Sequence, residues 1–415
     1  MERLPGFRDF FPEPLPSPED WSCDARQHIF DSWRSVAHRY GFREYDGPAL
    51  EPLELYTAKS GEEIVGQLFN FVDKGDRAVA LRPEITPTVA RMVAAGARAY
   101  KKPIKWFSVP QLYRYEKQQK GRLREHFQLN CDIFGEADRA ADAEIIALLI
   151  DQLRALGLTA SDFVIRLSSR QAWQQFFEKH RGDPARAYEF YQIVDKIERE
   201  QPEVTTRKLA DLGLSSDAVE AFITAGEPTE DLAAVVENLA ARGLREYVKI
   251  DYNVIRGLAY YTGVVFEAFD RGGEFRAIAG GGRYDGLVKL VSGGRVDMPA
   301  LGFGMGDVVL TDLLKDRGRL PRFSAGVEVV VLIEDETLRA DSLALVQRLR
   351  EAGRTTEYSL TAAKSDRQFK RAVELGARHT LRLERDPLGV IQARLKTLAT
   401  REEQIVDPAS IMTKL

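Results

Sequence analysis

Apolar side chains recur three or four residues apart over residues 22–40, which predicts a helix with one buried face. Gly41 ends this pattern, and the aromatic residues after it predict an extended segment over 42–48. The helical spacing returns over 140–155, and an apolar run over 163–167 predicts a strand directly after that second helix. The first part of the chain therefore mixes helices and strands.

Two segments rich in β-branched and aromatic residues, 104–116 and 125–135, predict strands joined by a long basic loop. From 169 to 245 the pattern becomes helical, with many charges and no convincing strand. Strand-like sequence returns at 247–254. We therefore expect the region 169–245 to be an inserted helical domain.

A different pattern begins after the linker-like segment 315–321. Apolar runs of strand length alternate there with helical spacing. Strands are predicted over 327–333, 354–360 and 379–383, and helices over 338–349 and 366–375. Such alternation is typical of a small parallel α/β domain.

Composition limits the kind of protein that this chain can be. Hydrophobic residues make up 44% of the 415 residues and charged residues 29%, which favours folded domains and excludes disorder of the whole chain. No stretch approaches the roughly 18 uncharged apolar residues of a membrane-spanning helix. Two cysteines are too few for a disulfide framework, and the first residues carry no export signal, so we expect a soluble cytoplasmic protein with no membrane partner. The net charge of −4 argues against non-specific coating of long nucleic acid but permits a local basic site.

Positive charge is concentrated in the predicted strand–loop–strand segment. Arg114, Lys117, Lys120, Arg122 and Arg124 lie within 11 positions of each other. This density suits a triphosphate or an RNA end, since both are polyanionic. A solvated charged loop explains the same pattern equally well.

Three other segments carry candidate chemistry, each with a structural alternative. Glu84 lies between two prolines and can hold an ammonium group, but such a segment more often begins and caps a helix. Arg256, with the paired Tyr260 and Tyr261, would place a guanidinium and two phenols at the rim of a sheet, although paired tyrosines are ordinarily packing residues. The alternating glycines of 302–306 permit close approach of a chain or a nucleotide but are weak evidence for a ligand.

The sequence argues against several other kinds of site. The five histidines are scattered and neither cysteine has a partner at ligand spacing, so no protein-ligated zinc and no metal ligands are expected. No Gly-x-Ser-x-Gly sequence appears, and the glycine-rich run lacks a matching βαβ unit. A serine hydrolase and a dinucleotide-binding fold therefore have no support.

Taken in order, these segments resemble class II aminoacyl-tRNA synthetases, and most closely the histidyl-tRNA synthetase family, over nearly the whole chain. The matching segments are 5–12, similar to the family's opening; 40–51, similar to its dimer-forming first motif; 81–86 and 114–132, similar to its ATP and amino-acid loops; and 256–263 and 281–285, similar to the two sequences peculiar to the histidine enzymes.

The resemblance implies an α+β catalytic domain with a six-stranded antiparallel sheet over 1–168 and 246–318, a helical insertion over 169–245, and an α/β anticodon-binding domain over 326–415. It also implies a homodimer. The implied reaction activates L-histidine with ATP, in the presence of Mg²⁺, to histidyl-adenylate and pyrophosphate, and then transfers histidine to the 3′ end of tRNA(His). Because a carboxylate is already ionised near neutral pH, the first step needs positioning and charge neutralisation rather than a general base.

The resemblance also implies which residues form the site. The cations expected at the α-phosphate are Arg114 and Arg256. The residues expected to bind histidine are Glu84, Thr86, Gln128, Asp132, Tyr260, Tyr261 and Tyr284. The residues expected to bind ATP are Arg114, Glu116, Arg122, His126, Phe127, Gly304 and Gly306.

Four features depart from the usual pattern of the family. The third motif lacks its ATP-bracing arginine, since Gly306 is followed by Asp-Val-Val. Ala259 replaces a common Asp, Asp132 replaces a common Glu, and His126-Phe127 reverses the usual order. The same variants resemble the organellar branch of the family, so an active enzyme is still expected. The candidate substitutes for the missing cation are Arg122, Arg124 and Arg283.

Two alternatives use the same fold without charging tRNA. The first is a relative of the regulatory subunit of ATP phosphoribosyltransferase, whose sequence is close to residues 81–87. That subunit usually lacks the C-terminal domain, whereas residues 326–415 are present here with 15 basic and 14 acidic residues. The second is an RNA-sensing module without chemistry, which predicts loss of Glu84, Arg114 or Arg256, and all three are present.

Overall fold

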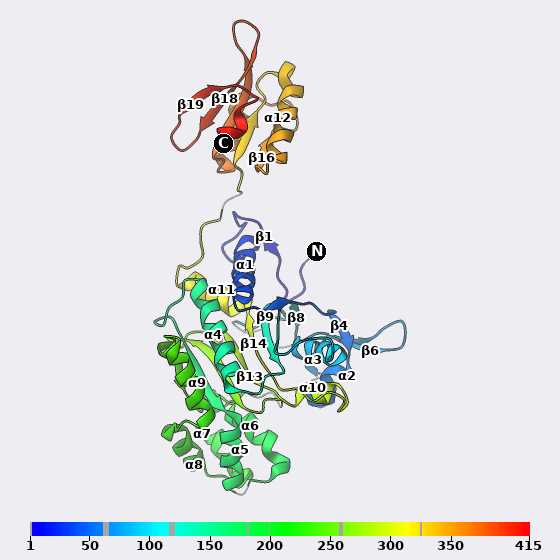
Figure 1. The fold of residues 1–415 in the computed structure, drawn as a ribbon, viewed down its shortest axis with the longest axis vertical. Coiled ribbons are helices and arrows are strands. Elements are labelled where there is room, and N and C mark those ends of the chain that lie inside the picture. Colours follow the sequence, from blue (N-terminus) through cyan, green and yellow to red (C-terminus); the bar gives the residue numbers. More distant parts are fainter. Residues whose placement is uncertain are drawn as a thin grey trace. The chain divides into compact units, whose positions relative to one another are not determined.

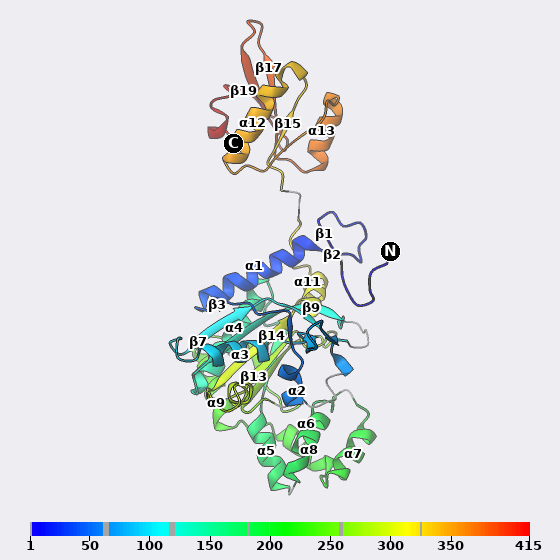
Figure 2. The ribbon, with the colours of Figure 1, turned by 90° about the vertical axis from the view of Figure 1, so that its right-hand side faces the viewer.

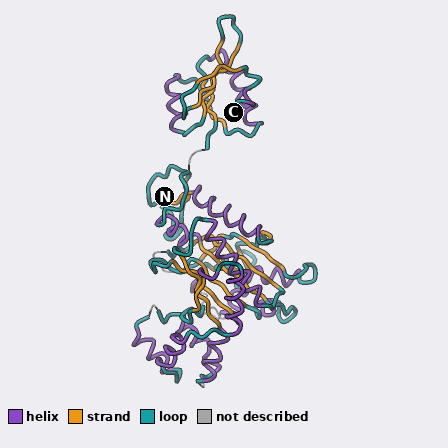
Figure 3. Tube along the Cα trace, turned by 60° about the vertical axis from the view of Figure 1, so that its left-hand side comes forward, coloured by secondary structure: helices purple, strands orange, loops and turns teal. Residues whose placement is uncertain are grey.

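The computed structural model describes residues 2–60, 66–115, 121–180, 182–198, 200–256, 260–323 and 326–415. The chain divides into two compact units, residues 1–9 with 25–320 and residues 10–24 with 321–415. Their elements are shown from three directions in Figure 1, Figure 2 and Figure 3.

A mixed sheet runs through the first unit (Figure 1). Its order is β11 (Val248–Ile250), β10 (Phe163–Ser169), β12 (Val264–Asp270), β13 (Ala279–Arg283), β14 (Ala300–Gly306), β9 (Glu125–Phe134), β7 (Ile104–Ser108) and β3 (Arg43–Glu44), and β8 (Gln111–Tyr113) also pairs with β9. From β10 to β7 every neighbouring pair is antiparallel, which confirms the expected six-stranded antiparallel sheet. The two end strands, β11 and β3, add to it in parallel pairings.

The strand expected over 104–116 is divided in two. β7 ends at Ser108 and β8 begins at Gln111, because Pro110 between them has no N–H to donate to a ladder. The Pro110 carbonyl still accepts a hydrogen bond from the Gln128 N–H at 3.1 Å. Pairing with β9 then resumes with Gln111 opposite Phe127.

Helices cover both faces of this sheet. α1 (Cys23–Arg39), α4 (Arg139–Ala155) and α11 (Asp307–Asp316) share one apolar core with the odd-numbered side chains of β9. α3 (Thr86–Gly96) and α10 (Leu287–Val291) form a second core on the opposite face. Beside α3 lie α2 (Glu54–Ser60) and a three-stranded sheet of β4 (Leu50–Pro52), β6 (Ala78–Leu81) and β5 (Asn70–Val72). The second face is the one that carries the polar site described below.

Residues 170–241 form helices joined by loops (Figure 3). The α-helices are α5 (Arg170–Lys179), α6 (Ala187–Val194), α7 (Pro202–Asp211), α8 (Ser216–Ala225) and α9 (Glu230–Ala241). The described part of this stretch contains no strand, so the predicted helical pattern is confirmed. The boundaries expected for separate domains stay predictions.

The second unit contains a five-stranded sheet with α12 (Arg339–Glu351) and α13 (Ser365–Glu374). Its order is β16 (Thr356–Tyr358), β15 (Val329–Leu332), β17 (His379–Arg385), β18 (Ile391–Thr397) and β19 (Glu403–Val406). The first three strands are parallel, but β17, β18 and β19 are antiparallel, so the expectation of a purely parallel sheet is wrong. The reason is the short turn around Asp386, which accepts from the N–H groups of Leu388 and Val390, since so short a turn can only join antiparallel strands.

The remaining strands are β1 (Phe10–Phe11) and β2 (Trp21–Ser22), which pair in parallel and also belong to the second unit. Across the described ranges, every helix is too short or too polar to span a lipid bilayer.

Candidate active site

Strand β9 separates two kinds of side chain by simple alternation. Leu129 and Cys131 are fully buried in the core with α1 and α4. On the opposite face, Gln128 donates to the Asn130 side chain at 2.7 Å and lies 3.4 Å from the ring of His126. Because successive side chains of a strand point to opposite faces, Asp132 joins this polar row.

The glycines of β14 make room for that row. Gly302 lies opposite Asp132, Gly304 opposite Asn130 and Gly306 opposite Gln128. A Cβ atom on Gly302 would clash with the carboxylate of Asp132, and one on Gly304 would clash with the amide of Gln128. The alternating glycines therefore have a physical reason at this place, which is the close approach of neighbouring side chains.

Asp132 continues the polar row of β9 and is 1% exposed. Its Oδ1 atom accepts a hydrogen bond from the hydroxyl of Tyr284, while its Oδ2 atom is buried and has no partner among the described residues. Burial raises the pKa of Asp132 to about 7; the hydrogen bond from Tyr284 opposes this, and the charge of Glu84 adds to it. An unpartnered buried acceptor is costly for a protein unless a ligand satisfies it.

A second buried group without a partner among the described residues lies close to Asp132, and no motif in the sequence points to it. The hydroxyl of Tyr45 is buried without a hydrogen-bond partner among the described residues. Burial first, and then the charge of Asp132, raise the pKa of Tyr45 well above its ordinary value. Its ring packs against Trp106, with 5.7 Å between centroids. The signal that would have found it is a tyrosine directly after the edge strand β3, which pairs with β7.

Beside Tyr284 lie three more of the expected histidine-binding residues, which are Glu84, Tyr260 and Tyr261. The Tyr260 hydroxyl donates to Glu84 at 2.9 Å, although these residues are 176 positions apart. The rings of Tyr260 and Tyr261 lie 4.8 Å apart, and those of Tyr260 and Tyr284 5.7 Å apart. Thr86, at the start of α3, is buried directly after the loop that carries Glu84.

Arg256 occupies an unusual backbone position. Its φ angle is +59°, in the left-handed region that residues with a side chain rarely adopt. Its Nη1 atom donates to Glu267 at 2.5 Å, and its guanidinium lies 5.7 Å from the centre of the Tyr261 ring. Burial alone would lower the pKa of Arg256, but Tyr261 and Glu267 outweigh this effect and raise it. A Cβ atom on Gly280 would clash with its guanidinium, so this glycine also makes room for a site residue.

The expected ATP-binding residues are only partly brought together. Arg114 donates from Nε to the carbonyl of Pro83 at 3.0 Å, which joins the two loops expected to form the site. Burial lowers the pKa of His126 to about 3, and Arg114 adds to this effect, so the imidazole is neutral. Arg122 is exposed, and Glu116 lies outside the described residues.

Phe127 points away from this group. Its ring packs 5.2 Å from Phe30 of α1 and lies 5.3 Å from the guanidinium of Arg26. This is the core face of β9, opposite to the face of His126. Of the two aromatic residues left open for stacking on adenine, His126 is therefore the one on the polar face.

Arg8 and Asp307 form a buried ion pair that the sequence did not reveal. Arg8 donates to Asp307 at 2.9 Å and to Glu125 at 2.8 Å, and all three side chains are at most 3% exposed. Asp307 also accepts from the backbone N–H of Phe127 at 3.0 Å. Although burial lowers it, the pKa of Arg8 is raised because of Asp307 and Glu125. The first segment of the chain is thereby fixed to the start of β9 and to the head of α11.

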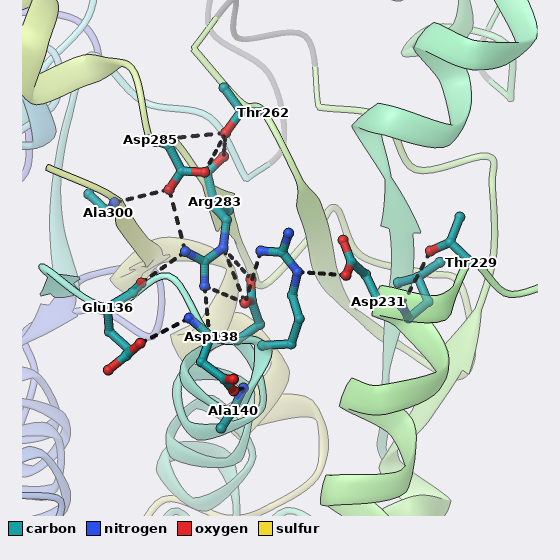
Figure 4. A network of polar contacts seen from close by, with 12 residues as sticks. Glu136, Asp138, Ala140, Thr229, Asp231, Thr262, Arg283, Asp285 and Ala300 are labelled. Atoms are coloured by element: carbon teal, nitrogen blue, oxygen red, sulfur yellow. Dashed lines mark hydrogen bonds and ion pairs between the residues drawn. The ribbon is translucent and has the colours of Figure 1, made fainter. Parts of the chain in front are cut away.

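Arg283 belongs to a different network, which Figure 4 shows. Its side chain is 1% exposed, pairs with Asp142 of α4 and donates to the carbonyls of Glu136 at 3.0 Å and Asp138 at 3.2 Å. Asp285, beside it, is 3.4 Å from the Thr262 hydroxyl. The suggestion that Arg283 replaces the missing ATP-bracing arginine is wrong, because these partners already occupy its donors.

The six-stranded antiparallel sheet, with its polar row on the face away from α1 and α4, is the fold of class II aminoacyl-tRNA synthetases. Solved structures share it: one described as histidyl-tRNA synthetase from Nostoc sp. PCC 7120 superimposes with a TM-score of 0.77 over 97% of each chain at 23% identity. Another, described as an ATP phosphoribosyltransferase regulatory subunit/histidyl-tRNA synthetase from Bacillus halodurans, gives 0.73 over 92% of this chain and 97% of that one at 22% identity.

Sequence comparison identifies the family. Residues 17–306 match the family described as histidyl-tRNA synthetase. A histidine–tRNA ligase of Opitutus terrae is 46% identical over 97% of this chain and 95% of its own. The chloroplastic/mitochondrial histidine–tRNA ligase of Arabidopsis thaliana is 38% identical over 90% and 78%. The chain belongs to the histidyl-tRNA synthetase family.

Proposed function

We propose that this protein is an aminoacyl-tRNA ligase that activates L-histidine with ATP and transfers it to tRNA(His). Relatives named histidine–tRNA ligase match nearly the whole chain, which supports the reaction. The structural observation that supports histidine as the amino acid is the buried carboxylate of Asp132, which has one oxygen without a partner among the described residues. A pocket with such an acceptor rejects an apolar side chain, because the acceptor would stay unpaired.

In this proposal the imidazole of histidine lies against Asp132. The Oδ2 atom accepts an imidazole N–H, and Tyr261 and Tyr284 form the phenolic walls of the pocket. Glu84 holds the substrate ammonium together with Thr86 and Gln128. This division is supported by the bond from Tyr260 to Glu84, which connects the two parts of the pocket.

Adenylate formation needs cations at the α-phosphate of ATP, since the histidine carboxylate attacks there and pyrophosphate leaves. We assign this role to Arg114 and Arg256. The neutral ring of His126 is available to stack on adenine. Gly306, where a Cβ atom would meet only the His126 ring, permits ATP to approach the strand, while the room at Gly304 is taken up by Gln128. Arg124 or Arg122 replaces the arginine missing from the third motif. Mg²⁺, held mainly by the phosphates, accompanies ATP; no group of three or more His, Cys, Asp or Glu side chains in the described part of the chain is arranged to hold a metal by itself.

The other parts of the proposal concern partners and location. We propose a homodimer formed through residues 40–51, an anticodon-binding role for residues 326–415, a helical insertion over 169–245, and a cytoplasmic location. The sheet of the second unit, with two helices, gives the C-terminal residues a folded surface of their own for tRNA.

The test is histidine-dependent exchange of labelled pyrophosphate into ATP, followed by charging of total tRNA with the same preparation. Exchange and charging are both expected. Exchange without charging would contradict the proposed transfer to tRNA. Histidine binding without exchange would instead favour a regulatory protein like the subunit of ATP phosphoribosyltransferase.

A further inference from the structure

Arg170 contacts the chain on both sides of the segment 256–263. It is the first residue of α5, directly after β10, and is 5% exposed. Its Nη1 atom donates to the carbonyl of Arg256 at 3.0 Å and to that of Ile255 at 3.3 Å. Its own backbone N–H donates to the carbonyl of Gly263 at 2.9 Å. One residue thus holds both ends of the segment that carries Arg256, Tyr260 and Tyr261.

Among the described residues, no carboxylate forms an ion pair with the Arg170 guanidinium. Its donors go to the two backbone carbonyls, and its Cζ atom lies 3.6 Å from the centre of the Tyr191 ring in α6. Burial lowers the pKa of Arg170 to about 10, so the side chain stays charged at neutral pH. A buried cation is costly unless it is well paired, and an apolar residue would pack here at lower cost. The carbonyl contacts therefore indicate a positional role rather than a contribution to stability.

Arg256 is the place where such a contact matters. The other described non-glycine residues with positive φ, Asp76 and Arg401, lie in exposed turns. Arg256 adopts φ of +59° beside the pocket, where Nη1 must reach Glu267 and the substrate phosphate. Strained backbone persists only where its surroundings determine it, and the carbonyl of Arg256 is a direct partner of Arg170.

We propose that Arg170 is a positioning residue for adenylate formation, which fixes the backbone of Arg256 and so connects α5 and α6 to the reacting phosphate. The proposal rests on the catalytic role given to Arg256 under the proposed function. A neighbouring contact agrees with it, since Trp173 of α5 donates to the carbonyl of Tyr252 at 3.2 Å. The backbone before Arg256 is thus held from α5 at more than one point.

The experiment compares pyrophosphate exchange by wild type, Arg170→Met, Arg170→Lys and the control Arg166→Met. Arg166, on β10, also stacks on an aromatic ring, at 4.5 Å from Phe269. It pairs with Glu198 and Asp251 instead, and within the described chain it makes no hydrogen bond to residues 255 and 256. We expect Arg170→Met to lower kcat by about 10- to 100-fold with little change in the KM for histidine, as for a lost positioning contact. Arg170→Lys should recover part of this loss, and Arg166→Met should resemble wild type.

A double variant separates this role from general damage. If Arg170 acts through Arg256, then Arg170→Met causes no further loss of exchange when Arg256→Ala is already present. Losses that multiply, or an Arg170→Met enzyme as active as wild type, would overturn the proposal while leaving the proposed function intact.

A readout that does not need activity is cleavage by trypsin after Arg256, followed by mass spectrometry. We expect faster cleavage there in Arg170→Met than in wild type or Arg166→Met, and equal rates in all three would count against the proposal. A wild type without any exchange would refute the proposed function instead, and this cleavage rate would still decide whether Arg170 fixes the segment.

Discussion

Asp132→Asn tests the electrostatics of the pocket. The pKa of Asp132 is about 7 in the folded protein against an ordinary 3.8, because burial outweighs the hydrogen bond from Tyr284. Between pH 3.8 and about pH 7, Asp132 is protonated in the folded protein but ionised in the unfolded chain. The stability this provides is present in full below the unfolded-state pKa and is lost as the pH rises through the folded-state pKa. At about 1.4 kcal/mol per pH unit, ionising the buried carboxylate costs about 4 kcal/mol, of which about 3 kcal/mol falls between about pH 5 and 8.

The asparagine variant keeps the Oδ1 atom that Tyr284 contacts, but it cannot ionise. Its Nδ2 group takes the buried position of Oδ2, and leaving that group unpaired costs about 1–3 kcal/mol at every pH. This cost is the same at every pH. It therefore does not affect how the difference in unfolding free energy between variant and wild type changes with pH. We therefore expect the free energy of unfolding of the variant, relative to wild type, to rise by about 3 kcal/mol from about pH 5 to 8.

The assay is urea unfolding at closely spaced pH values, followed by tryptophan fluorescence. Three of the four tryptophans, Trp33, Trp106 and Trp173, lie in the same compact unit as Asp132. Asp297→Asn is the control, because that carboxylate is 68% exposed and should give a difference from wild type that stays constant with pH. A constant difference for Asp132→Asn as well would refute the reasoning, since it would mean that the carboxylate titrates alike in both states.

The other predictions concern different parts of the site. Arg256→Ala should slow pyrophosphate exchange by about 10²- to 10³-fold while the protein stays folded, because a preorganised charge is removed from the phosphate; near-normal exchange would remove Arg256 from catalysis. Gly304→Ala should raise the KM for histidine about tenfold, because the new methyl group clashes with Gln128 and overpacking costs about 1–3 kcal/mol. A KM like that of wild type would show that Gln128 does not position the substrate. Asp307→Ala should lower the free energy of unfolding by about 3–5 kcal/mol, because Arg8 loses a buried partner; an unchanged urea midpoint would show that Glu125 alone satisfies Arg8.

The resemblance drawn from the sequence predicted the six antiparallel strands, because their segments stand in the family's order. Alternation of side chains along 125–135 also predicts that β9 has two different faces. It does not predict which of these faces packs in the core. That choice depends on α1, whose Phe30 packs against the ring of Phe127, and on Gly302 and Gly304 of β14, which make room for Asp132 and Gln128. Because a strand places neighbours on opposite faces, Phe127 and His126 cannot both face the polar row, which the family resemblance alone does not show.

Other features arise only when distant segments meet. Arg8 and Asp307 are 299 positions apart, and each looks like an ordinary surface charge in its own segment. Arg170 looks like a helix-start residue, because the carbonyls it contacts lie 85 and 86 positions later. In the second unit, alternation along 391–397 is typical of a strand but does not give its direction. A short turn and no crossover helix precede this strand, so it pairs antiparallel and the sheet is mixed.

The missing arginine of the third motif can be understood from these contacts. Val309 stands at its usual place and is 8% exposed, so it offers neither charge nor access. Arg8 is a cation at the start of α11, but Glu125 and Asp307 both pair with it and neutralise its charge. We therefore expect a cation for ATP to come from the basic hairpin rather than from α11. Arg124 fits this requirement, since its guanidinium lies 4.4 Å from the centre of the Tyr115 ring and its Nε atom is buried without a hydrogen-bond partner in the described chain.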